Sequence, residues 1–539
     1  MPDGYSPFLR IPPFPGHKGG ALTRTGHSNI DVQEIAAAII AERVGGSFWG
    51  AQPDMDNNVI LLAPDSEDQL QAMLARLSRD QRSAAIAPGM HLPNHCQRLP
   101  VDCDPWHLAA SAREVWAGAN QEIALVASMS GVSMSLFGDG RFAGCDVTPE
   151  AALAEVVSGW RYISPFTCED WSPITAIAQL AAWRKLIDAN RKIDAVYGVA
   201  GWKRVTLDAM LWDGSSPVAY ARGFRSIRAT RQYQIAWKSR VASRLLAKLA
   251  NSGAHVGEIE DGFIRSVGLG ANCVPPLSTI VDFTGIYFDP NQESDLENIL
   301  QKDKFDEKLC RRAAALKNRL IEAEISKYGQ GRNDIKLTDI NRYKVLVAGQ
   351  VEDDRSICTG GAGMTNLELL ARARTHAPDA HIIYKPHPDV VAGHRKGHVE
   401  TADALRFADE IQNNAAITSL IEAVDGVHVI TSLAGFEALL RGKAVTTHGV
   451  PFYAGWGLTK DLSEVPARRT RRLSLDELVA GTLLLYPRYT DPVTRLPCSA
   501  ELLVERMAQG EARISTPLIT LREWQGRLRL LLRSFIRRH

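Results

Sequence analysis

The feature of this sequence that most constrains its fold is the alternation of short apolar runs with loops and helical segments. Runs typical of buried strands occur at residues 59–63, 84–87, 192–197, 255–259, 343–348, 381–384 and 427–430. The runs are followed by loops and by stretches with helical periodicity. Strands that alternate with helices are typical of parallel α/β layers. The sequence therefore predicts an α/β protein.

Length and charge narrow the class further. The 539 residues suggest about three domains. With 62 Lys and Arg against 61 Asp and Glu, the net charge of +1 excludes a global basic field for nucleic acid. The chain has no apolar run of membrane-spanning length, and its start lacks the apolar core of a secretory signal. Its eight cysteines form no CxxC pair, which favours free thiols over disulfides or zinc. We therefore expect a cytoplasmic protein.

A weak internal repeat runs through the chain in constant order. Residues 59–68, 86–93, 115–122 and 155–159 parallel residues 345–354, 382–388, 430–437 and 477–481, respectively. Each match is short enough to arise alone by chance. The first copy lacks the KPHP run of the second, and it has Ala117 where the second has Ser432. We therefore predict that residues 30–185 are a diverged copy of residues 340–510. We expect this copy to have a structural or docking role and not to form a second active site.

Two adjacent carboxylates, Glu260 and Asp261, follow the expected strand at 255–259. The carboxyl end of a parallel strand is where α/β sheets bind ligands. A carboxylate there can take a proton from an acceptor hydroxyl, and Arg265 can hold an anionic substrate in a bidentate pair. The alternative is a helix cap with a local ion pair.

A second acidic loop follows the strand at 343–348. It begins with Gly349 and Gln350, which we expect to contact the substrate, and carries three acids at positions 352–354. Its carboxylates suit a nucleophile or the stabilisation of an oxocarbenium ion. Partner ligands at metal spacing do not accompany them, so we expect no metal. A solvated acidic turn explains the loop equally well.

Two further loops carry groups suited to a nucleotide. Lys385 and His387 stand in a KPHP run whose prolines stiffen the backbone, and both side chains suit a phosphate. Ser432 opens a helix after the strand at 427–430, where a hydroxyl and free amides can take a phosphate oxygen. Glu437, inside that helix, can accept hydrogen bonds from ribose hydroxyls. The alternative is a helix cap and an ordinary helical glutamate.

Five segments together resemble the capsule polysaccharide biosynthesis family, which includes β-Kdo glycosyltransferases. They are EDGFIRSVGLG (260–270), GQVEDDRSI (349–357), TNLELL (365–370), YKPHPDV (384–390) and TSLAGFEALLRGKAVTTHGVPFYAGWGLT (431–459). The likeness spans about residues 190–510. It implies a GT-B fold of two Rossmann-like domains facing across a cleft. Here they would follow an extra degenerate Rossmann-like domain.

The resemblance implies a retaining transferase that moves β-Kdo from CMP-β-Kdo to a saccharide or glycolipid acceptor in surface polysaccharide assembly, with no cofactor and no metal. By position, Asp354 matches the nucleophile and Glu260 with Asp261 the essential acidic pair. Residues matching the contacts to CMP are Lys385, His387, Ser432 and Glu437. Retention would follow from double displacement, in which one carboxylate forms the adduct and another group shuttles the proton.

Two departures from the family pattern stand out. Arg355 occupies a position where the family more often has alanine, and Trp202–Lys203 and Trp237–Lys238 match its glycine-tryptophan signature only loosely. Two other functions stay open. One is a GT-B transferase or epimerase with another nucleotide sugar, and the other is a non-catalytic component of polysaccharide export.

These inferences define five predicted regions: an irregular arm at 1–29, the degenerate domain at 30–185, an acceptor-side domain at 190–335, a CMP-sugar-binding domain at 340–510 and a basic tail at 511–539. The charged stretch at 295–325 is expected to form a connecting helix pair. In the tail, Arg alternates with apolar residues at helical spacing over 521–539. Such a helix suits either the anionic inner-membrane surface or packing against the protein.

Overall fold

The structure is a computed structural model that describes residues 6–56, 58–78, 80–146, 148–223, 233–266, 273–326, 329–330, 337, 341–393 and 395–514. The chain divides into two compact units. Unit 1 holds the described residues up to Asp194, together with Asp208–Ala219 and Val493–Leu496. Unit 2 holds Ala195–Leu207, Tyr220–Pro492 and the described residues from Pro497 onward.

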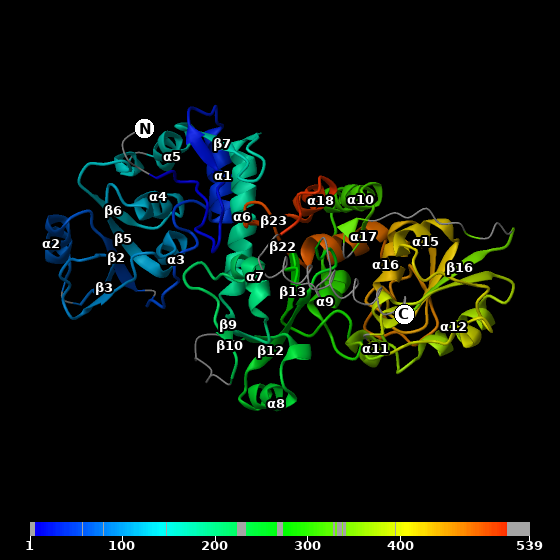
Figure 1. The fold of residues 1–539 in the computed structure, drawn as a ribbon. Coiled ribbons are helices and arrows are strands. Elements are labelled where there is room, and N and C mark those ends of the chain that lie inside the picture. The colour runs from blue at the N-terminus through cyan, green and yellow to red at the C-terminus, as the bar shows by residue number, and fades with distance from the viewer. Residues whose placement is uncertain are drawn as a thin grey trace, which may run out of the picture. The chain divides into compact units, whose positions relative to one another are not determined.

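Unit 1 is built on a parallel five-stranded sheet in the order β4-β3-β2-β5-β6 (Figure 1). Its strands are β2 (Val59–Ala63), β3 (Arg82–Ala85), β4 (Cys96–Arg98), β5 (Ala112–Gly118) and β6 (Met134–Phe137). Helices α2 (Glu67–Arg76), α3 (Pro105–Ser111) and α4 (Glu122–Met129) connect them. All five residues of β2 are buried, as the predicted apolar run requires.

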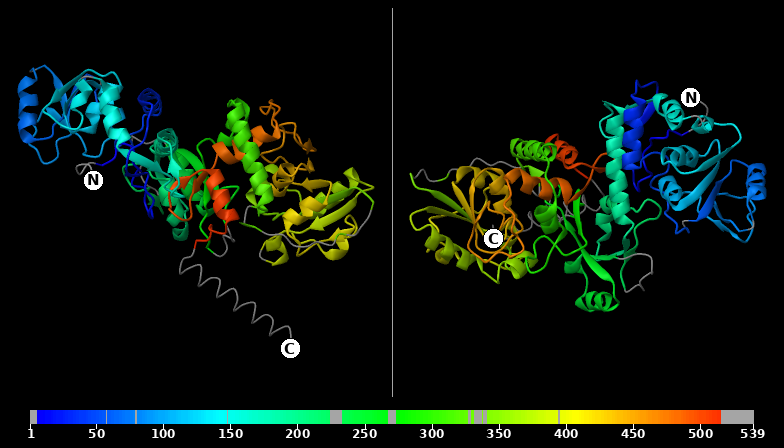
Figure 2. Two further views of the ribbon diagram at one scale, coloured as in Figure 1. Left: turned by 90° about the horizontal axis from the view of Figure 1, so that it is seen from above. Right: turned by 180° about the vertical axis from the view of Figure 1, so that it is seen from behind.

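The rest of unit 1 packs around a long helix. Its elements are β1 (Thr23–Thr25), α1 (Val32–Glu42), η1 (Ala143–Asp146), α5 (Pro149–Ser158), β7 (Trp160–Ile163), β8 (Asp170–Trp171) and α6 (Pro173–Asn190). Helix α6 lies beside α1 and β7 in all three views (Figures 1 and 2). The amino-terminal arm is irregular but well packed, because the buried Phe14 ring lies edge-on against Trp183 and Trp212.

Unit 2 contains a seven-stranded sheet in the order β10-β9-β11-β12-β13-β22-β23. Its strands are β9 (Ile193–Tyr197), β10 (Tyr220–Ala221), β11 (Tyr233–Ala236), β12 (His255–Asp261), β13 (Ser278–Asp282), β22 (Arg488–Thr490) and β23 (Pro497–Cys498). Strands β11 and β12 run parallel, but β12, β13, β22 and β23 pair antiparallel. The sheet is therefore mixed, whereas the strand–helix alternation predicted parallel layers. Residues 488–498 also join this sheet and not the one expected for residues 340–510.

The second sheet of unit 2 is parallel and six-stranded, in the order β18-β17-β16-β19-β20-β21. Its strands are β16 (Lys344–Ala348), β17 (His381–Lys385), β18 (Glu410–Ile411), β19 (Gly426–Val429), β20 (Ala444–Thr447) and β21 (Lys460–Asp461). Residues alternate between its two faces, so Val345 and Val347 belong to one core and Leu346 and Ala348 to the other.

Helices connect successive strands of this sheet along the chain. They are α11 (Arg355–Gly360), α12 (Asn366–His376), α13 (Pro388–Val391), α14 (Thr401–Ala404), α15 (Ile417–Ala423) and α16 (Leu433–Leu440). The remaining elements of unit 2 are η2 (Gly201–Lys203), α7 (Arg204–Met210, which ends in unit 1), η3 (Lys238–Arg240), α8 (Ser243–Asn251), α9 (Asp295–Lys302), α10 (Glu307–Glu322), β14 (Ile325–Ser326), β15 (Gly329–Gln330), α17 (Leu475–Val479), η5 (Ala480–Leu485) and α18 (Ala500–Ala508).

The charged stretch at 295–325 forms a helix pair, α9 and α10. Helix α10 lies beside α17 and α18 (Figure 2). Its Leu316 and Leu320 are buried, and its Arg319 pairs with Glu505 of α18. The pair therefore anchors the carboxyl-terminal helices in addition to linking the sheets along the chain.

The two parallel sheets share a strand order. Strands β2 to β6 occupy in one sheet the places that β16 to β20 occupy in the other. Each unit also has an antiparallel hairpin, β7–β8 or β22–β23, that leads to a serine-capped helix. The two hairpins carry a left-handed residue at the same place, Cys168 (φ 62°) or Arg495 (φ 66°). This agreement favours the repeat, which stays a prediction.

Two predictions concern the chain ends and membranes. In the part of the chain that the structure describes, no helix is both long enough and apolar enough to cross a bilayer. The amphipathic segment at 521–539 lies outside the described residues, so its contact with a membrane surface stays a prediction.

Candidate functional site

Acidic side chains are concentrated at the carboxyl end of β12. Alternation along the strand places Glu258 and Glu260 on one face and Asp261 on the other. Glu258 is fully buried and contacts two cations, Lys238 at 3.1 Å and the Arg355 guanidinium. A buried carboxylate requires such partners, because an unpaired one would be strongly destabilising. The predicted acidic pair is therefore part of a larger charged cluster.

Asp261 is held in its ionised form. Its two carboxylate oxygens accept hydrogen bonds from the Lys203 ammonium at 3.0 Å and from Arg265 Nε at 2.7 Å. Burial alone would raise the pKa of Asp261, but these two cations outweigh it and hold the pKa below its ordinary value. Asp261 is thus a fixed negative charge and a poor proton acceptor.

Glu260 has the opposite character. Burial, and then the charges of Glu258 and Asp261, raise its pKa to about 8, despite Lys203 and Arg355 nearby. Neighbouring carboxyls whose pKa values are pushed apart are typical of acid–base sites. A pKa near neutrality suits a group that exchanges a proton during catalysis. Of the predicted pair, Glu260 is the group equipped to move a proton.

Arg265 supports Asp261. It is only 1% exposed, and its two Nη atoms donate to Ser266 Oγ at 2.6 Å and to the Val274 carbonyl at 3.0 Å. With Nε bound to Asp261, the guanidinium is fully engaged within the protein. This geometry favours a positioning role over the predicted direct grip on an anionic substrate.

The sequence analysis did not assign roles to Lys203, Lys238 and Arg355, which complete the cluster. Burial lowers the pKa of Lys203 to about 8 even though Asp261 lies beside it, and its Nζ lies 3.2 Å from the centroid of the Trp237 ring. The signal that could have found the lysines is the Trp-Lys dipeptide, which occurs at 202–203 and 237–238.

Gly349 and Gln350 hold the loop after β16 in place. A Cβ at Gly349 would lie 2.9 Å from the Tyr384 hydroxyl oxygen, so a larger residue there would have to displace the buried Tyr384 side chain. The Gln350 side chain accepts from Thr431 N at 2.8 Å and donates to Thr431 Oγ1 at 3.2 Å. It thereby joins the ends of β16 and β19, and its contacts are structural.

The three acids of this loop differ in their contacts. Glu352 accepts from Asn366 N at 2.8 Å, and Asp353 pairs with Arg395 at 3.0 Å. Asp354 is exposed and caps α11 by accepting from Arg355 N at 2.7 Å. Among the described side chains, none forms an ion pair with Asp354. Of the three, it is the carboxylate most available to a ligand.

Lys385 and His387 follow β17. The buried Lys385 ammonium donates to the Asn413 carbonyl at 2.7 Å, and burial lowers its pKa. His387 Nδ1 accepts from Asp389 N at 3.1 Å, and burial lowers the pKa of the ring. This hydrogen bond assigns the proton of the neutral ring to Nε2. His387 can therefore donate from Nε2 to a phosphate oxygen.

Ser432 and Glu437 lie on α16. Ser432 caps the helix by accepting from Ala434 N at 3.2 Å, and its carbonyl accepts from the Tyr453 hydroxyl at 2.5 Å. Glu437 is buried within the same helix. The structure thus brings Asp354, Lys385, His387 and Ser432 to the carboxyl ends of adjacent parallel strands, where such sheets bind ligands.

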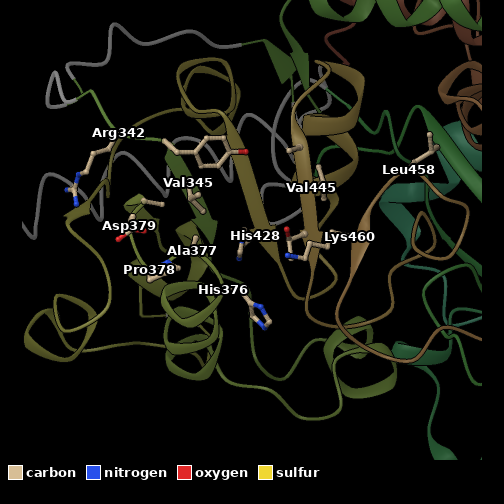
Figure 3. Close-up of a pocket in the computed structure, with 14 residues that line it drawn as sticks. Arg342, Val345, His376, Ala377, Pro378, Asp379, His428, Val445, Leu458 and Lys460 are labelled. Carbon is tan, nitrogen blue, oxygen red and sulfur yellow. The ribbon is translucent and has the colours of Figure 1, made fainter.

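A separate pocket of about 720 Å³ is lined by residues of β16, β19 and β20 and by the end of α12, among others (Figure 3). It is lined by Arg342, Tyr343 and Val345, by His376 to Ala380, and by His428, Ala444, Val445, Thr446, Leu458 and Lys460. Burial lowers the pKa of His428 to about 4, so its ring is neutral. No residue of the predicted site lines this pocket.

A metal centre was not expected. Within the described ranges, no group of three or more His, Cys, Asp or Glu side chains is arranged to hold a metal ion. The absence of a metal from the reaction stays a prediction.

Comparison with known proteins identifies relatives that match more than half of this chain. Capsule polysaccharide modification protein LipA of Neisseria meningitidis serogroup A is 42% identical over 348 residues, which are 63% of this chain and 49% of that protein. The chain therefore spans about half the length of LipA. The β-Kdo 2,4 transferase of Thermosulfurimonas dismutans KpsC is 31% identical, with a TM-score of 0.51. That match covers 58% of this chain and 98% of the solved one.

The family assignment rests on two findings. The model of a family described as capsule polysaccharide biosynthesis protein matches residues 234–336 and 308–489. Lipopolysaccharide-processing protein LpsZ of Rhizobium meliloti is 41% identical over 330 residues, which cover 58% of this chain and 73% of that protein. The chain thus belongs to the capsule polysaccharide biosynthesis protein family.

Proposed function

We propose that this protein is a retaining glycosyltransferase of capsule or surface polysaccharide biosynthesis, which moves β-Kdo from CMP-β-Kdo to a saccharide or glycolipid acceptor. The likeness to the β-Kdo 2,4 transferase, at 31% identity over 98% of its chain, is the observation that carries the proposal. The proposed architecture is GT-B, in which the two sheets of unit 2 belong to Rossmann-like halves and residues 30–185 form an additional degenerate domain. No metal or cofactor takes part.

The proposed donor site lies at the carboxyl ends of the six-stranded sheet. His387 donates its Nε2 proton to the CMP phosphate, assisted by the charge of Lys385 and by the Ser432 hydroxyl. Glu437 accepts hydrogen bonds from the ribose. Lys385, His387 and Ser432 lie at the ends of strands of one parallel sheet, and Glu437 lies within α16.

The proposed reaction has two displacements. The Asp354 carboxylate attacks the anomeric carbon of the donor, and the bond to the phosphate oxygen breaks with CMP leaving as the anion. An acceptor hydroxyl then attacks the same carbon and Glu260 takes its proton, while the bond to Asp354 breaks and restores the carboxylate. Two inversions leave the configuration retained. Lys203 and Arg265 hold Asp261 in its ionised form, which leaves Glu260 as the carboxyl of the pair that changes protonation.

A donor panel tests the proposal. The full chain is incubated with CMP-β-Kdo, generated in the same reaction, or with UDP- and GDP-sugars, and release of each nucleotide is measured. We expect release of CMP alone, faster when an acceptor is present. Turnover of a UDP-sugar but not of CMP-β-Kdo would replace the proposed donor, and the absence of any turnover would favour a non-catalytic role.

His387→Asn is expected to weaken donor binding without unfolding the protein. Asparagine can still cap α13, so the fold is retained, but the Nε2–H donor to the phosphate is lost. Loss of a hydrogen bond to a charged group corresponds to about a tenfold to hundredfold higher KM for the donor. Steady-state kinetics and thermal melting measure the two effects. An unchanged KM would exclude His387 from donor binding.

A further inference from the structure

Arg355 connects the two sheets of unit 2. It begins α11, directly after Asp354, and its guanidinium reaches Glu258 on β12. One Nη contacts Glu258 Oε1, and the other lies 3.2 Å from Oε2. The first Nη also lies 3.5 Å from Glu260 Oε1. Arg355, which follows the proposed nucleophile Asp354, is therefore ion-paired to β12, the strand that carries the proposed base Glu260.

The geometry of this contact restrains the position of the Arg355 guanidinium. Each of the two Nη atoms donates to a different oxygen of the same carboxylate, and this bidentate contact fixes orientation as well as distance. Glu258 is fully buried, so water does not compete for it. The guanidinium also lies over the Phe288 ring, with Cζ 4.9 Å from the centroid. A contact of this kind can fix the position of the start of α11 relative to β12.

We propose that Arg355 is a positioning residue, which ties the amino terminus of α11 to β12 through Glu258 and so fixes where Asp354 stands relative to Glu260. The inference rests on the proposed function, because it assigns Arg355 a role between the two groups of that reaction.

The same loop supplies a matched control. Arg395 pairs with Asp353, the residue before Asp354, but both side chains are more than 40% exposed. This pair does not reach β12 and is weakened by solvent. Arg395→Ala therefore removes an arginine and its ion pair with this loop but leaves the contact between Arg355 and Glu258 intact.

Arg355 also acts on the charge of Glu260. Among the described residues, the charged groups that act on Glu260 are Glu258 and Asp261 on β12, Lys203 on η2 and Arg355 on α11, and Lys238 on η3 pairs with Glu258. Glu258 and Asp261 favour the protonated form of Glu260, whereas Lys203 and Arg355 favour the ionised form. Removal of Arg355 leaves Lys203 as the remaining favourable cation in this set, so Glu260 should ionise at a higher pH.

The experiment compares full-length wild type with Arg355→Ala, Arg355→Lys and Arg395→Ala. In Arg355→Ala we expect kcat to fall about a hundredfold, the loss that a misplacement of about 1 Å can cause, with the donor KM changed less than about threefold. The rise of activity with pH should move to higher pH. Arg355→Lys should recover part of kcat, and Arg395→Ala should stay within about twofold of wild type.

Hydrogen exchange provides a readout that does not depend on turnover. Peptides covering residues 351–360 should exchange at least about tenfold faster in Arg355→Ala than in wild type or Arg395→Ala. Unchanged exchange would contradict the proposal that Arg355 holds the start of α11 to β12, whether or not the protein is active. Faster exchange with unchanged kcat would overturn the positioning role. An inactive wild type would refute the proposed function instead, and exchange would still decide whether Arg355 holds α11.

Discussion

Asp354→Asn is expected to abolish sugar transfer while the protein stays folded. Asparagine caps a helix about as well as aspartate, so α11 keeps the hydrogen bond from Arg355 N. The amide, however, is not a nucleophile and carries no charge for an oxocarbenium-like transition state. We expect the transfer rate to fall at least about 10³-fold, the scale seen when a covalent nucleophile is removed.

Asp353→Asn is the matched control for this substitution. It neutralises the preceding carboxylate, which is exposed and paired with Arg395. We expect activity within about threefold of wild type, because an exposed ion pair contributes little. Transfer assays and thermal melts of both variants measure the difference. Equal activity of Asp354→Asn and wild type would remove Asp354 from the mechanism.

Glu260→Gln is expected to slow transfer about 10²- to 10⁴-fold, the contribution of a positioned general base. Glutamine preserves the shape of the side chain but cannot take the proton of the acceptor hydroxyl. The rate of CMP release from the donor in the absence of an acceptor is expected to fall less than the rate of transfer, since the first displacement does not use Glu260. A variant with wild-type transfer would exclude Glu260 as the base.

The pH profile gives an independent test of Glu260. Its pKa is raised to about 8, so the carboxyl is mostly protonated at pH 7 and ionised above pH 8. A base acts only when ionised, and Glu260 acts in the second displacement, so wild-type kcat/KM for the acceptor should rise about tenfold per pH unit below 8 and level off above it. This rise should be absent from Glu260→Gln. A wild-type profile that is flat between pH 6 and 9 would contradict the assignment.

Several elements of the fold could be predicted because their signals are local. The strands β2, β16 and β17 are buried on both faces and therefore appear as continuous apolar runs. The hairpin β22–β23 could not be predicted, because its strands have three and two residues and lie among prolines. Its pairing with β13 depends on contacts about 200 residues away in the chain. The sequence offers no periodicity that would reveal such a pairing.

The candidate site was predictable in part for the same reason. Asp354, His387 and Ser432 follow buried strands, and the topology of a parallel sheet brings strand ends together. The contrast between Glu260 and Asp261 was not predictable, since it depends on Lys203, about 58 residues away, and on Arg355, about 95 residues away. Arg265 shows the converse, because its spacing suggested a substrate contact and its burial gives it a supporting role.

The most direct test of the proposed activity is the product itself. The full chain is incubated with CMP-β-Kdo and candidate saccharide and glycolipid acceptors, and the product is analysed by mass spectrometry and by NMR of the new linkage. The proposal predicts an acceptor extended by Kdo in the β configuration, formed by wild type and Asp353→Asn but not by Asp354→Asn. A product of inverted configuration, or one built from another nucleotide sugar, would contradict it.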